Sequence, residues 1–74
     1  MEKYSETDLI AAVRRHALDN YESDGWDFVY ECWDDGDILE RISDANAQTP
    51  DAAIKACLSW VALYDERRRE IRNA

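Results

Sequence analysis

The chain has 74 residues, 17 acidic and 9 basic side chains and a formal net charge of −8. A chain of this length holds a single core, and its 46% hydrophobic content, with eight aromatic residues, favours folding over disorder. The sequence contains no run of roughly 18 apolar residues, which argues against a membrane span. The deficit of Lys and Arg argues against direct binding of nucleic acid, because phosphate neutralisation needs an excess of cations.

The two thiols and the first residues indicate a reducing compartment. Cys32 and Cys57 make no disulfide framework, and their spacing matches no zinc or redox motif. The opening residues, MEKYSETD, lack the apolar run typical of a secretory signal. We therefore expect a cytoplasmic protein in which both cysteines are small apolar core residues.

A first helix is predicted over about 6–20. Ser5 followed by Asp8 resembles a capping box, in which a hydroxyl and an acidic side chain satisfy the first free backbone groups. Apolar residues then recur at helical spacing: Leu9, Ile10, Val13, Ala17 and Tyr21. The polar residues 22–25 end this helix.

Two shorter helices are predicted in the middle of the chain. The first covers about 25–34, and its apolar stripe has offsets of three and four: Trp26, Val29, Tyr30 and Trp33. The second covers about 37–43, where Asp37 is the predicted N-cap and the inward side chains are Ile38, Leu39 and Ile42.

The last helix is predicted over about 50–72, after a polar loop. Thr49 is its expected N-cap and Pro50 its first residue, and the inward stripe is Ile54, Cys57, Leu58 and Val61. Asp65 and Arg69 are expected to form an i,i+4 ion pair. No segment has the pattern of a strand. The fold class is therefore all-α, a single domain over 1–74 built as a small bundle of three to four helices, two long with one or two short ones between.

The negative charge is concentrated in the middle of the chain. Residues 19–44 contain ten acidic side chains and one basic side chain, a net charge of −9, whereas the two flanks together carry +1. On a helical wheel, an acidic face opposite the apolar stripe contains Asp24, Asp27, Glu31 and Asp34, and Asp35 extends it. Such a row attracts a basic surface, so the expected partner is a larger basic protein or a nucleic-acid-binding complex. The alternative is a solvated face that only maintains solubility.

The aromatic residues allow two interpretations, core or interface. Phe28 and Trp60 lie at the edges of their apolar stripes and are the expected partly exposed interface aromatics. A bundle this small can also complete its core by pairing with a second copy. A structural homodimer without a ligand is therefore an alternative.

A calcium loop is the other alternative, because residues 20–31 partly match the EF-hand pattern. The oxygen ligands would be Asn20, Glu22, Asp24 and Glu31, and a glycine stands at the sixth position. The eighth position, normally apolar, is Asp27, and the chain has no second loop to pair with it. The only histidine, His16, has no evident nucleophile or orienting group in sequence, so we expect a protein that is not an enzyme and has no cofactor.

One stretch of the chain resembles known short proteins. The sequence GWDFVYECWDD at 25–35, followed by Ile38, Leu39 and Glu40, looks like small acidic helical proteins common in phages and mobile elements. The helix start at 49–53 and the DERR motif at 65–68 fit the same class. The resemblance implies a phage-type accessory protein in the host cytoplasm, and some members of this class inhibit host nucleases or defence complexes by mimicking DNA.

Overall fold

The computed structural model describes residues 3–73 and folds them into four helices. They are α1 (Glu6–Asp19), α2 (Asp24–Cys32), α3 (Asp35–Asp44) and α4 (Pro50–Asn73). The all-α prediction is confirmed, and the described part of the chain contains no strand. The predicted helix bounds differ from those in the structure by at most two residues.

Side-chain caps explain where the helices begin. Ser5 and Asp8 form a reciprocal capping box, with each backbone N–H donating to the other side chain at 3.1 Å. The Thr49 hydroxyl accepts from the N–H of Ala52 at 3.2 Å and caps α4. Helix α3 starts two residues earlier than expected because Asp34, and not Asp37, is its N-cap.

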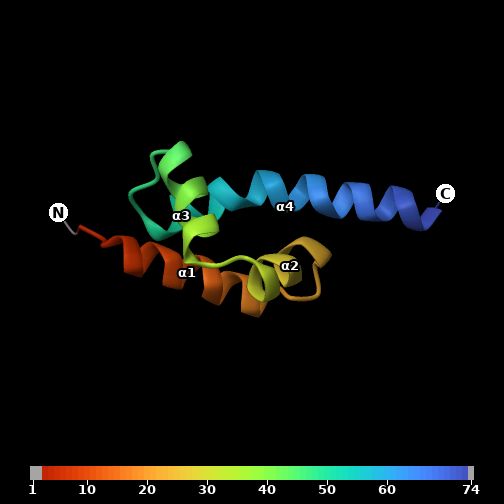
Figure 1. Cartoon of the computed structure of the whole chain (residues 1–74), viewed down its shortest axis with the longest axis horizontal. Coiled ribbons are helices and arrows are strands. Elements are labelled where there is room, and N and C mark those ends of the chain that lie inside the picture. Colours follow the sequence, from red (N-terminus) through yellow and green to blue (C-terminus); the bar gives the residue numbers. More distant parts are fainter. Residues whose placement is uncertain (1–2, 74) are drawn as a thin grey trace.

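The two long helices organise the molecule. In Figure 1, α1 and α4 run in the same direction along the long axis, and α3 stands across them. Helices α1 and α4 pack against each other, and each also contacts both α2 and α3. Within the described residues, α2 and α3 do not pack on each other. The molecule measures 48 × 20 × 19 Å, and the C-terminal end of α4 projects beyond the other helices (Figure 1).

The core takes residues from all four helices. Its buried members are Leu9, Val13, Ala17, Trp26, Val29, Ile38, Ile42, Ala53, Cys57 and Val61. Three residues expected on the inward stripes are instead exposed: Tyr21 (61%), Tyr30 (40%) and Leu58 (46%). Tyr21 falls in the turn because α1 already ends at Asp19. Helix α2 buries the side that carries Gly25 and Val29, which turns Tyr30 towards solvent.

Gly25 is the point where α2 lies closest to α4. A Cβ at this position would lie 2.7 Å from Val61 Cγ1 and 2.9 Å from the Val61 carbonyl oxygen. Asp65 of α4 binds the first turn of α2. Its carboxylate accepts hydrogen bonds from the N–H of Gly25 at 2.6 Å and from the Ser23 hydroxyl at 2.7 Å. The expected ion pair of Asp65 with Arg69 is wrong, since no such pair forms among the described residues. Asp65 instead accepts hydrogen bonds at the N-terminus of α2, where the helix dipole favours a negative charge.

The two cysteines lie in different environments. Cys57 is fully buried, as expected, and burial raises the pKa of its thiol to about 11 against a smaller opposing effect of Arg41. The prediction that Cys32 is a core residue is wrong, because Cys32 is exposed at the last position of α2. In the described part of the chain, no helix is both long and apolar enough to cross a membrane.

Candidate functional site

Three of the ten carboxylates in residues 19–44 are held in ion pairs. These are the only ion pairs among the described residues: Arg14–Asp35 at 2.6 Å, Arg15–Asp19 at 3.1 Å and Arg72–Asp24 at 2.9 Å. Each arginine comes from outside the acidic segment, from α1 or from the end of α4. The flanks of the chain therefore neutralise part of the negative charge of its middle.

Two further carboxylates build the start of α3. The N–H of Asp37 donates to Asp34 Oδ1 at 2.9 Å, and the N–H of Asp34 donates to Asp37 Oδ2 at 3.2 Å. Asp34 lies beyond the end of α2 at Cys32, so it does not continue the helical face of Asp27. The prediction that Asp34 shares that face is therefore wrong.

The five remaining carboxylates are exposed and have no partner among the described residues. They are Glu22, Asp27, Glu31, Glu40 and Asp44. Asp27 and Glu31 are one turn apart on the outward side of α2, with an axial rise of about 6 Å. Of the five residues of the predicted acidic face, only these two have no partner in the described part of the chain, because Asp24 and Asp35 are in ion pairs and Asp34 caps α3.

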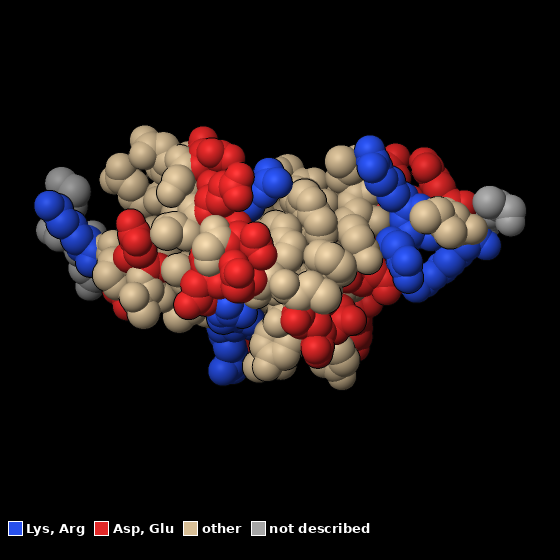
Figure 2. Space-filling view, viewed as in Figure 1, with Lys and Arg blue, Asp and Glu red and all other residues tan. Residues whose placement is uncertain are grey.

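The charged side chains are unevenly distributed over the surface. Figure 2 shows most carboxylates over the middle of the molecule, with a few basic groups among them, and both basic and acidic groups at the projecting end of α4. That end contains four exposed arginines: Arg67, Arg68, Arg69 and Arg72. Glu66 and Glu70 lie among these arginines, so the end of α4 carries mixed charge and the net negative charge stays in the middle of the molecule.

A cluster of four aromatic rings lies beside the acidic residues. The ring centroids of Trp33 and Trp60 are 4.8 Å apart, and Phe28 lies 5.6 Å from Trp60. Tyr64 stacks on Trp60 at 5.1 Å. All four side chains are only half-buried, which agrees with the edge positions of Phe28 and Trp60. Sequence reasoning missed Trp33 and Tyr64 as members of this cluster, although the i,i+4 spacing of Trp60 and Tyr64 was a usable signal.

A groove of about 310 Å³ opens next to these rings. It exists because α2 and α3 both pack on α4 but not on each other. The aromatic side chains of Phe28, Trp33 and Trp60 line one part of the groove. Helix α3 lines the other part with Asp37, Glu40 and Arg41. Aromatic rings and carboxylates thus meet in one depression.

The predicted calcium loop does not form. Helix α2 begins at Asp24, so Asp24 and Glu31 lie about 10 Å apart along one helix axis and not around one loop. The Asn20 side chain donates to the His16 carbonyl at 2.8 Å, and Asp24 is paired with Arg72. No group of three or more His, Cys, Asp or Glu side chains in the described ranges is placed to hold a metal ion.

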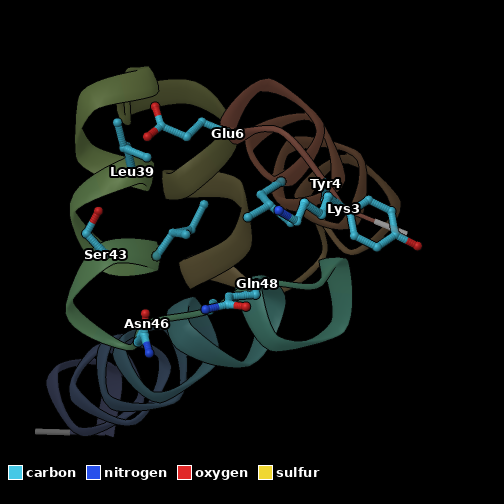
Figure 3. A pocket seen from close by; sticks show the side chains of 10 residues that line it. Lys3, Tyr4, Glu6, Leu39, Ser43, Asn46 and Gln48 are labelled. Atoms are coloured by element: carbon cyan, nitrogen blue, oxygen red, sulfur yellow. The ribbon is translucent and has the colours of Figure 1, made fainter. Parts of the chain in front are cut away.

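A second depression, of about 410 Å³, lies between the N-terminal segment, the start of α1 and α3. Figure 3 shows it between Lys3 and Tyr4 of the N-terminal segment and Leu39 and Ser43 of α3. Asn46, which adopts a positive φ of 51° in the connection to α4, closes its lower edge. The charges of Lys3 and Glu6 offset each other here, so this depression favours neither anions nor cations.

Comparison of the chain with known proteins gives no match. No protein-family model, no curated protein and no solved structure matches it. What the chain does is therefore inferred from its own geometry and charge.

Proposed function

We propose that the chain is a non-enzymatic protein–protein interaction module whose acidic segment, residues 19–44, binds a basic surface on a larger protein. The observation that carries the proposal is that five of its carboxylates have no partner within residues 3–73. The three ion pairs offset only three of the nine net negative charges of the segment. The unpaired charges attract a basic partner and accelerate its association.

In its most concrete form, the protein mimics DNA and inhibits a nucleic-acid-binding complex. The axial rise between Asp27 and Glu31, about 6 Å, is close to the rise of two nucleotides on one DNA strand, about 6.8 Å. Glu22, Glu40 and Asp44 add further charges on the same segment. In this form, the protein is a phage-type accessory protein that acts in the host cytoplasm.

The test compares two variants that lose the same charge at different places. Asp27→Asn with Glu31→Gln removes two charges from α2, and Glu66→Gln with Glu70→Gln removes two from the end of α4. All four residues are exposed and have no partner among the described residues, so neither variant disturbs the fold. Each variant and the wild-type chain are immobilised and exposed to a host-cell lysate.

The expected result is a basic protein that duplex DNA and moderate salt elute from the wild-type chain. The Glu66/Glu70 variant retains this protein and the Asp27/Glu31 variant loses it. Equal retention by both variants would contradict the proposal. Retention that resists salt and duplex DNA would contradict the DNA-mimic form.

A structural homodimer is the second candidate function, favoured by two exposed apolar side chains in the C-terminal half of α4. Leu63 is 49% exposed and Ile71 is 67% exposed. Sedimentation velocity of the wild-type chain and of Leu63→Ser with Ile71→Ser tests this candidate. A dimer that the double variant dissociates supports it, and a wild-type monomer at high concentration removes it.

A further inference from the structure

The groove between α2, α3 and α4 has the composition of a site for one organic cation. Trp33 and Trp60 present half-buried rings whose centroids are 4.8 Å apart. The face of an indole ring attracts a cation through its quadrupole, and tryptophan does so best among the aromatic residues. Tyr64 covers one side of Trp60, so the aromatic surface offered to a positively charged, planar group is the part of Trp33 and Trp60 that lines the groove.

The wall of the groove on α3 supplies acceptors. Glu40 is exposed and has no partner in the described part of the chain, so both of its oxygens are available. Asp37 uses one oxygen, Oδ2, to accept from the N–H of Asp34, which leaves Oδ1 available. A guanidinium presents a rigid fork of donors that fits carboxylates of this kind.

The charged side chains that line the groove have a net charge of −1. Asp37 and Glu40 are acidic and Arg41 is basic. Arg41 makes no ion pair with any described residue, and no cation–ring contact of its guanidinium is seen there. The groove is therefore complementary to a single additional positive charge.

We infer that this groove receives an arginine side chain of the basic partner. The guanidinium packs against Trp33 and Trp60 and donates to the carboxylates of Glu40 and Asp37. Arginine fits better than lysine because it is planar and weakly hydrated, whereas the lysine ammonium is compact and strongly hydrated. The inference rests on the proposed function for a basic partner, and it adds the residue type that the partner places at the centre of the contact.

The test titrates the full chain with hexa-arginine and with hexalysine, two peptides of equal charge, and follows tryptophan emission. Trp26 is buried and Trp33 and Trp60 are half-buried, so a change in emission reports mainly on the groove. A stacked guanidinium corresponds to about a two- to fivefold tighter binding of hexa-arginine. Two peptides that bind with equal affinity would overturn the inference and leave the proposed function intact. A chain that binds neither peptide would overturn both.

Single substitutions test whether the preference for hexa-arginine over hexalysine arises in the groove. Trp60→Leu is expected to remove the preference for hexa-arginine, whereas Tyr21→Leu, at a 61% exposed aromatic residue in the α1–α2 turn, retains it. Glu40→Gln is expected to weaken hexa-arginine binding at least twofold more than Glu66→Gln, which changes the net charge equally. Circular dichroism checks the fold of the Trp60 variant, and if that variant unfolds, the Glu40/Glu66 comparison decides. A preference that survives both groove substitutions would overturn the inference.

Discussion

Replacing Gly25 by alanine tests how closely α2 and α4 meet, which sets the position of the aromatic cluster. The new Cβ would lie 2.7 Å from Val61 Cγ1 and 2.9 Å from the Val61 carbonyl oxygen. Carbon atoms in contact are normally about 3.5–4.0 Å apart, so the two helices must separate by roughly 1 Å. Overpacking of this kind costs about 1–3 kcal/mol, while alanine in place of glycine in a helix returns up to about 1 kcal/mol. Because the close atoms include the Val61 backbone, which cannot rotate away, the cost lies in the upper part of that range, about 2–3 kcal/mol, and the expected net loss of unfolding free energy is about 1–2 kcal/mol.

Gly36→Ala is the matched control for this substitution. Gly36 is the second residue of α3, as Gly25 is of α2, but Gly36 is exposed, and the nearest atom to its Cβ is Asp34 Oδ1 at 3.2 Å. Urea unfolding followed by circular dichroism at the helix band gives both free energies. We expect Gly36→Ala to be neutral or stabilising by up to about 1 kcal/mol. A Gly25 variant as stable as the Gly36 variant would refute the close approach of α2 and α4.

Further predictions concern Asp65 and the two thiols. Asp65→Ala removes the acceptor of two hydrogen bonds at the start of α2 and is expected to cost about 2 kcal/mol in urea unfolding, whereas Glu66→Ala stays within about 0.5 kcal/mol of the wild type. A thiol reagent at neutral pH is expected to modify Cys32 rapidly and Cys57 only on unfolding, and mass spectrometry of a time course checks this. Because the pKa of Cys57 is raised to about 11 from 9.0, its thiol stays protonated in the folded chain at pH values where the unfolded chain loses the proton. Stability is therefore expected to fall between about pH 9 and 11, by on the order of 2 kcal/mol, and Cys57→Ala should flatten this slope relative to Cys32→Ser.

The fold was largely predictable because its signals are local. Ser5 with Asp8, and Thr49 with Pro50, mark helix starts through contacts within one turn. The burial predictions were wrong where the exposure of a side chain depends on a helix that is distant in the sequence. Tyr30 follows the same spacing rule as Val29, but its exposure depends on which side of α2 faces α1 and α4.

The candidate site was only partly predictable, because contacts between helices distant in the sequence decide which charges are paired and where the groove lies. A helical wheel places Asp24 beside Asp27 but does not show that Arg72 reaches back from the end of α4 to pair with it. The helical wheel also continues α2 through Asp34, whereas in the structure Asp34 is the N-cap of α3. The groove itself follows from the way α2 and α3 pack separately on α4, and no local pattern in the sequence encodes that arrangement.

The most direct test of the central claim, that the unpaired carboxylates of residues 19–44 are a binding surface, is the affinity of the full chain for hexalysine at low and high salt. The wild-type chain is compared with the Asp27/Glu31 and Glu66/Glu70 double variants, which lose the same two charges. We expect affinity to fall steeply with salt, and the Asp27/Glu31 variant alone to bind at least about threefold more weakly. Equal weakening of both variants would contradict the claim, because binding would then follow the net charge of the molecule and not this surface.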